Sequence, residues 1–179
     1  MRRTGALLLA AALACPLHAQ DALPARDALP ARLVADAPGL RPLGAGAYRW
    51  LGLEIYTATL WTRGAAPDFA QPFALSLRYA RSIKGTAIAA RSAEEIVKLG
   101  LGSAGELREW ERAMAGLFPD VSEGMTLTGQ NVPGVGVRFF QDARLLGEIG
   151  GPAFARAFFA IWLDPQTSAP RLRAALLSQ

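Results

Sequence analysis

Two kinds of apolar periodicity follow one another along this chain of 179 residues, and their order limits the folds open to it. Strand-like composition or period-two alternation occurs in five segments: 47–61, 73–80, 125–132, 135–140 and 145–149. Helical spacing occurs in four: 86–99, 103–118, 152–163 and 168–177. Strands and pairs of helices therefore come in separate runs rather than in βαβ units. This order predicts one α+β domain with a mostly antiparallel sheet.

Local signals place several element boundaries. Ser103 and Glu106 form a capping-box pair at the start of a predicted helix, Pro152 stands where a helix favours its first proline, and Ser168 is predicted to cap the last helix. The segment 47–61 is apolar at both parities, which is typical of a strand covered on both faces. Gly52 within it marks a turn or a bulge, and ordered structure is predicted to begin near residue 40.

The first nineteen residues have the three parts of a secretory leader. A basic start precedes the apolar run 5–14, and Leu17-His18-Ala19 is an acceptable if imperfect small-residue cleavage site. These features predict a signal peptide over 1–19 and a periplasmic or secreted protein. The apolar run is too short to be a permanent membrane anchor. In an alternative interpretation, residues 12–15 resemble a bacterial lipobox and Cys15 carries a lipid.

A tandem duplication follows the leader. The unit Asp-Ala-Leu-Pro-Ala-Arg occupies residues 21–26 and again 27–32. Two copies are too few for a repeat architecture, and a proline every sixth residue blocks a continuous helix. Residues 20–38 are therefore predicted to be a disordered linker, and residues 39–179 are predicted to form the domain.

The distribution of cysteine and histidine excludes several kinds of chemistry. The only cysteine, Cys15, and the only histidine, His18, both lie in the leader, so the mature chain has no disulfide and no His/Cys catalytic or metal site. Without Arg2 and Arg3, 17 of the 19 basic residues remain against 15 acidic ones, a balance that does not indicate nucleic-acid binding. The glycine pattern of residues 100–105 follows a helix rather than a strand and is read as a connector, not a dinucleotide site. No cofactor or metal is expected, and the oligomeric state stays open.

Three segments carry a family resemblance. Residues 43–61 contain a Gly-x-Gly turn, Arg49 and the run Ile55-Tyr56-Thr57-Ala58-Thr59-Leu60-Trp61. Trp110, the run 117–121 (Leu-Phe-Pro-Asp-Val) and Gly124 follow, and the third segment is 154–165 with 170–177. In this order they resemble the bacterial chalcone-isomerase-like proteins over roughly residues 40–177.

The resemblance implies an open-faced β-sandwich, in which a layer of helices covers one face of an antiparallel sheet and an apolar cleft lies between them. Relatives that bind fatty acids grip the carboxylate with an arginine and a tyrosine, and these match Arg49 (or, with a different register, Arg41) and Tyr56. True isomerases carry threonine where Tyr56 stands, which counts against ring closure of a chalcone. Three weaker candidates for lining the cleft are placed there only because they lie on predicted strands: Arg78, Tyr79 and Thr128.

Three functions remain open at this point. The leading hypothesis is a non-catalytic periplasmic protein that binds a small apolar acid, such as a fatty acid, in the cleft. The first alternative is an intramolecular lyase of the chalcone-isomerase type, in which Arg49 stabilises a phenolate and Tyr56 or a bound water polarises a carbonyl. The second alternative is an envelope interaction protein with a closed cleft.

Overall fold

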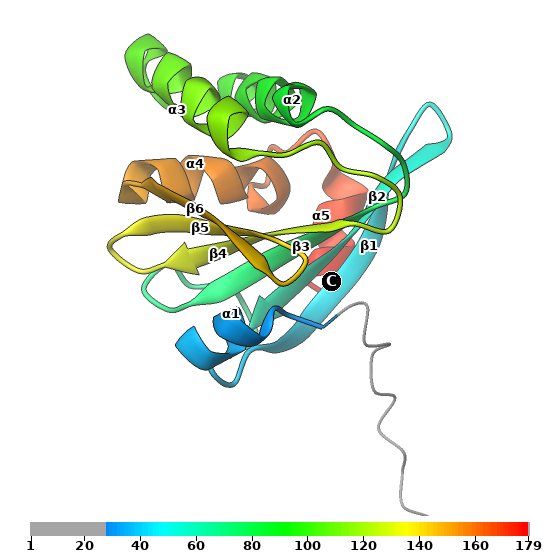
Figure 1. Ribbon diagram of the computed structural model, residues 1–179, viewed down its shortest axis with the longest axis vertical. Helices are drawn as coiled ribbons and strands as arrows, with labels where there is room; N and C mark the ends of the chain where they lie inside the picture. The colour runs from blue at the N-terminus through cyan, green and yellow to red at the C-terminus, as the bar shows by residue number, and fades with distance from the viewer. Residues whose placement is uncertain (1–27, 179) are drawn as a thin grey trace, which may run out of the picture.

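A single antiparallel sheet with helices packed against it makes up the fold (Figure 1). The computed structural model describes residues 28–178. Six strands pair in chain order: β1 (Arg41–Trp50), β2 (Leu53–Thr62), β3 (Phe73–Tyr79), β4 (Thr126–Val132), β5 (Gly136–Gln141) and β6 (Arg144–Gly150). Five helices accompany them: α1 (Ala31–Asp36), α2 (Gly85–Lys98), α3 (Ala104–Leu117), α4 (Pro152–Leu163) and α5 (Pro170–Leu176). The predicted α+β class with an antiparallel open sheet is confirmed.

The first predicted strand is wrong, because residues 47–61 belong to a hairpin of two strands. β1 and β2 pair with Tyr48 opposite Tyr56, and Leu51 and Gly52 turn the chain between them. Both turn residues have positive φ, 50° and 81°, as a two-residue hairpin turn with the twist of the sheet requires. Gly52 marks a turn or a bulge in the sequence, but leucine replaces the usual asparagine, aspartate or glycine at the first turn position, so the glycine alone does not identify a hairpin.

The linker prediction is wrong for residues 28–38, which fold onto the sheet as part of the domain. Leu33 and Ala37 are fully buried, and Leu29 is nearly so. These three residues are four apart, so α1 and the residues that flank it present one apolar face to the side of the sheet away from the other helices. Pro30 does not break this helix because it stands directly before the first helical residue. Residues 20–27 and the predicted signal peptide lie outside the described residues.

The main core lies on the other face of the sheet, beneath α4. In Figure 1, α4 runs against the sheet with α2 and α3 above it. The predicted apolar stripe of α4 is buried: Phe154, Phe158, Ile161 and Trp162. At the edge strand β1, a side-chain carbon on Gly44 would lie 2.2 Å from the carbonyl oxygen of Ala175, so glycine lets α5 approach the sheet.

One predicted helix cap is confirmed and another is wrong. Ser103 Oγ accepts from the backbone N–H of Glu106, and Glu106 accepts from the backbone N–H of Ser103, which confirms the capping box. Ser168 is not the cap of α5: Ala169 holds that position, and Ser168 Oγ instead donates to Glu95 Oε2 at 2.5 Å. Within residues 28–178 we find no helix with the length and apolar character needed to cross a membrane.

Candidate functional site

A cavity of about 180 Å³ opens between the helix-covered face of the sheet and the helices α2 and α4. Strands β1 to β5 form its floor, α2 forms one wall and α4 forms another. Seven aromatic residues of its lining come from β1, β2, β3, β5, α4 and the end of α3: Tyr48, Tyr56, Tyr79, Phe118, Phe139, Phe158 and Trp162. Because the polar groups are few, the cavity is suited to an apolar molecule oriented by a small number of hydrogen bonds.

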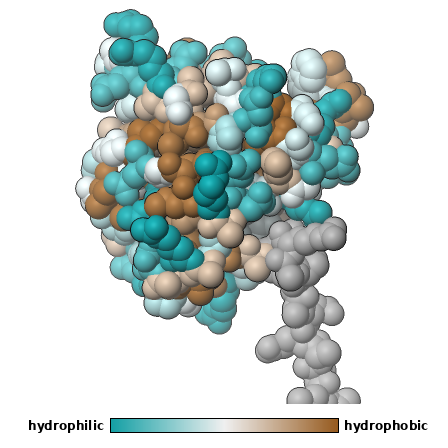
Figure 2. All heavy atoms as spheres, in the orientation of Figure 1, coloured by the Kyte–Doolittle hydropathy of each residue, from teal (hydrophilic) through white to brown (hydrophobic). Residues whose placement is uncertain are grey.

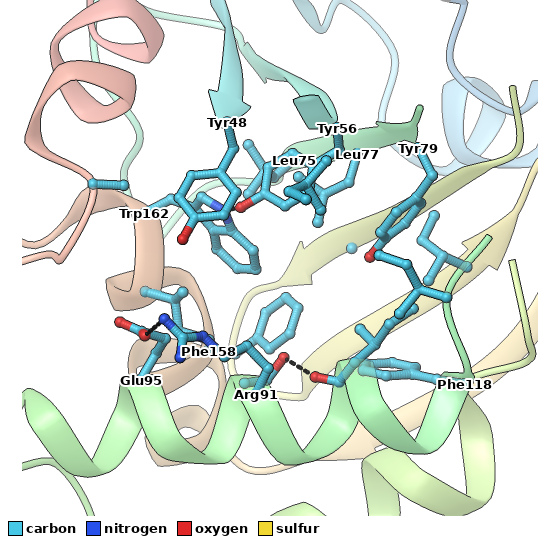
Figure 3. Close-up of a pocket in the computed structure, with 18 of the residues that line it drawn as sticks. Tyr48, Tyr56, Leu75, Leu77, Tyr79, Arg91, Glu95, Phe118, Phe158 and Trp162 are labelled. Carbon is cyan, nitrogen blue, oxygen red and sulfur yellow. Dashed lines mark hydrogen bonds and ion pairs between the residues drawn. The ribbon is translucent and has the colours of Figure 1, made fainter. Parts of the chain in front are cut away.

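Three tyrosines form a row across neighbouring strands on this floor. The sheet register places Tyr48 opposite Tyr56 and Tyr56 opposite Tyr79. The Tyr48 and Tyr56 rings are stacked with centroids 5.1 Å apart, and the Tyr56 and Tyr79 rings meet edge to face at 5.8 Å. Figure 3 shows the three rings along one side of the cavity, opposite Arg91 and Glu95 of α2. This row of tyrosines follows directly from the alternation of side chains along each strand and from the register of the hairpin.

Tyr56 and Tyr79 supply neutral hydrogen-bond donors rather than bases. Burial raises the pKa of both Tyr56 and Tyr79 well above the usual value of a phenol. Trp162 Nε1 donates to the Tyr56 hydroxyl at 3.0 Å, and this partly offsets the effect of burial. The hydroxyl thus acts as an acceptor for Trp162 and can still donate its own proton. Both phenols stay protonated throughout the physiological range of pH.

Charged groups gather on the α2 side of the cavity. Arg91 Nη2 lies 2.5 Å from Glu95 Oε1, and Arg91 Nη1 lies 3.3 Å from Glu94 Oε2. Lys98 Nζ lies 2.8 Å from Glu95 Oε1, and Ser168 donates to the other carboxylate oxygen. Half of the Arg91 side chain is exposed, whereas that of Glu95 is only 8% exposed. Arg91 therefore lies where the cavity meets solvent.

Glu95 stays ionised in spite of its burial. Burial is the largest single influence and raises the pKa of the carboxyl, but hydrogen bonds from Lys98 and Ser168 and the charges of Arg91 and Lys98 together outweigh it. The pKa of Glu95 is consequently lowered. This ion-paired carboxylate positions the guanidinium of Arg91 at the cavity.

The structure brings only two of the five predicted site residues together. Tyr56 and Tyr79 line the cavity. Arg49 does not: it lies near the end of the β1–β2 hairpin, is largely exposed and pairs with Glu54 at 2.8 Å. The expectation that the charge of Arg49 lies in the cleft is therefore wrong, because this residue lies near the end of its strand.

Arg78 and Thr128 also lie away from the cavity, because strand alternation turns them to the opposite face of the sheet. Arg78 lines a separate hollow there together with Ser76. The Thr128 hydroxyl forms a hydrogen bond with that of Ser76 at 3.0 Å. The alternative arginine, Arg41, begins β1 and is exposed.

Sequence reasoning did not single out Arg91 and Glu95 as site residues. A usable signal was present in the spacing. Arg91 and Glu95 follow Ile88 at i+3 and i+7, so they border the apolar stripe of α2 and face the same side of the helix. Among residues 28–178, no group of three or more His, Cys, Asp or Glu side chains could hold a metal ion.

Comparison with known proteins identifies the family. A model described as chalcone isomerase-like matches residues 28–178, which include the α1 segment. The chain belongs to the chalcone isomerase-like family. An uncharacterized protein of Haemophilus influenzae is 29% identical to it over 140 residues, which cover 78% of this chain and 68% of that protein. Among solved structures, a fatty-acid binding protein of Arabidopsis thaliana superposes with a TM-score of 0.63 at 12% identity, covering 79% of this chain and 88% of the other. At that identity the likeness shows the fold.

Proposed function

We propose that this protein binds a small apolar acid in the cavity between the sheet, α2 and α4. The observation that carries the proposal is the composition of this cavity: seven aromatic side chains surround it, and the guanidinium of Arg91 lies at its mouth. Aromatic walls stabilise an apolar body by burial and edge-to-face contacts. A cation at the mouth orients an acidic head group toward solvent.

The volume of the cavity limits the size of the ligand. A dry protein cavity of about 150 Å³ is large enough to hold benzene, and the cavity here measures about 180 Å³. A single aromatic ring, or an aliphatic tail of roughly six to eight carbons, is therefore the apolar body that fits. A long-chain fatty acid would have to leave much of its tail outside, which removes most of the burial that would bind it.

Arg91 has the donors needed for the head group. Two of its nitrogens pair with Glu94 and Glu95, but a guanidinium carries five N–H groups, so it can add a carboxylate without releasing either partner. The neutral hydroxyls of Tyr56 and Tyr79 offer further hydrogen bonds from the floor. Glu95 does not repel the acid strongly, because Lys98 and Arg91 flank its charge.

The alternatives have less support. The isomerase mechanism assigned a phenolate to Arg49, which lies outside the cavity. Among the described lining residues the one carboxylate is Glu95. Its hydrogen bonds and ion pairs lower its pKa, which makes it a poor general base. The hypothesis of an interaction protein with a closed cleft has no support from the structure, because a cavity is present between the sheet and the helices. Export to the periplasm rests on residues 1–19 and stays a prediction, which N-terminal sequencing of the exported protein tests.

Calorimetric titration with hexanoate, benzoate and palmitate tests binding. We expect hexanoate or benzoate to bind more tightly than palmitate, and we expect Arg91→Ala to weaken binding by roughly ten- to a hundredfold, the value of a charge-assisted hydrogen bond of about 1.5–3 kcal/mol. Arg49→Ala is the matched control, since it removes the same charge from a site outside the cavity.

Equal effects of the two substitutions would show that only net charge matters, and no effect of Arg91→Ala would refute the assignment of the head group. Tight binding of palmitate would refute the limit on ligand size. Turnover of a chalcone at an enzymatic rate would favour the isomerase instead.

A further inference from the structure

The turn between β1 and β2 carries an exposed apolar cluster, which we call the hairpin tip and define as residues 50–53. Trp50 is 58% exposed, Leu51 80% and Leu53 54%. Figure 1 shows this hairpin extending beyond the body of the domain, and Figure 2 shows hydrophobic side chains at its projecting end. The other large exposed hydrophobic side chains among the described residues, Val34, Val97 and Val135, stand singly on separate elements. Single apolar residues on a surface are ordinary, whereas a projecting group of three is not.

The conformation of Leu51 argues that its side chain is present for a reason other than folding. Its φ is +50°, in a region that disfavours a bulky side chain and favours glycine or asparagine. The side chain is mostly exposed, so burial does not compensate for this conformation. A leucine that costs stability and contributes nothing to the core points to a contact outside the domain.

The charges beside the hairpin tip cancel. Arg49 and Glu54 flank it, one on each strand, and pair across the hairpin at 2.8 Å. Residues 50–53 themselves are Trp-Leu-Gly-Leu and carry no charge. The tip can therefore leave water without carrying an unpaired charge with it.

We propose that the hairpin tip inserts into the surface of a lipid bilayer. Its three side chains offer apolar area on the order of 300 Å², given the area that one buried aromatic or aliphatic side chain contributes. A stable protein partner or a second copy of this chain would need about 800 Å² on each side. A convex tip of this size is too small for such an interface, but a bilayer needs no complementary surface. Tryptophan is moreover the side chain that favours the membrane–water boundary.

Contact with a bilayer would bring the cavity close to the membrane surface. Tyr48 is two residues before Trp50, Ile55 is two residues after Leu53, and both line the cavity. The proposal does not depend on the proposed ligand, because it concerns the protein without ligand and a surface outside the cavity.

Tryptophan fluorescence in the presence of vesicles tests the proposal. Trp50 is the only one of the four tryptophans that is exposed, since Trp61, Trp110 and Trp162 are buried, so a blue shift on adding vesicles reports on Trp50. We expect the full mature chain to bind large unilamellar vesicles of pure phosphatidylcholine weakly and reversibly. An association constant of about 10⁴ M⁻¹ or less is expected, because even a myristoyl chain gives no more.

Substitutions separate insertion from other kinds of adsorption. We expect Leu51→Asn to lower vesicle association about tenfold, and Leu51→Asn with Leu53→Asn to abolish it, since each buried leucine contributes that much or more. The melting temperature should stay the same or rise, because asparagine suits positive φ. Val97→Asn is the matched control on α2, an exposed apolar residue away from the tip, and should leave association within twofold of that of the unaltered protein.

Association should persist at 0.5 M NaCl, because the charges at the tip are already paired. No blue shift with vesicles, or equal losses from Val97→Asn and Leu51→Asn, would overturn the proposal. Loss of association in salt would show adsorption of the basic surface instead. A blue shift that grows with protein concentration in the absence of lipid would show that the tip contacts a second copy.

Discussion

Replacing Leu33 of α1 by alanine should destabilise the whole domain, although the sequence pattern predicts that this segment belongs to a linker. Leu33 is fully buried and packs with Trp61 and Phe140 on the face of the sheet opposite to the cavity. A six-residue helix has little stability of its own, so its order depends on this contact. Leu33→Ala should therefore lower the free energy of unfolding by about 2–5 kcal/mol, which corresponds to a fall in Tm of roughly 5–15 °C for a domain of this size.

Urea unfolding followed by tryptophan fluorescence measures the change, with circular dichroism as a second probe. Val34→Ala is the matched control, because Val34 is the next residue of the same helix and is 46% exposed. It should change the free energy of unfolding by no more than about 0.5 kcal/mol. If Leu33→Ala unfolds like the unaltered protein, α1 is not packed on the sheet in solution, and residues 28–38 form a linker after all.

Two further predictions concern the cavity. Tyr56→Phe should lower the free energy of unfolding by about 1–3 kcal/mol, because Trp162 Nε1 loses its acceptor. In a double-mutant cycle with Trp162→Phe, the two losses of stability should be less than additive. Additive losses would show that this hydrogen bond contributes nothing to stability. Glu95 has a lowered pKa in the folded state, so its contribution to stability is present above the ordinary value of 4.5 and is lost as the pH falls through the folded pKa. Glu95→Gln should therefore flatten the dependence of Tm on pH between about pH 5 and pH 3, and an unchanged acid limb would contradict this role.

Most of the fold could be predicted from patterns that are local in the sequence. The alternation of residues 73–80 and the capping box of Ser103 report on neighbours only a few positions away, and tertiary contacts agree with them here. The segment 47–61 went wrong because Leu51 is not a usual residue for the first position of a hairpin turn, so Gly52 alone did not separate a turn between two strands from a bulge within one. The spacing of Leu29, Leu33 and Ala37 was visible in principle, but the prolines of the duplicated unit outweighed it.

The candidate site was harder to predict, because its residues meet only through the pairing of strands and the docking of helices. Tyr56 and Tyr79 could be placed on strands, but which face each strand turns to the helices depends on register. Arg49 and Arg78 could not be assigned to a side of the sheet for the same reason. The spacing of Arg91 from Ile88 shows that it borders the apolar stripe of α2, but it does not show which part of the sheet α2 covers.

The β1–β2 hairpin joins the two proposed binding surfaces, and its position in the sheet gives a physical reason for this. β1 is an edge strand, and α5 supports it where Gly44 and Gly46 let the helix come close. Beyond that point the register shifts between Tyr48 and Arg49, and the hairpin projects from the body of the domain (Figure 1). The aromatic core beneath α4 remains packed whatever the hairpin tip contacts, since none of its side chains comes from residues 50–53. The hairpin can therefore present an apolar tip to a bilayer, and Tyr48 and Tyr56 to a ligand, without weakening the core of the domain.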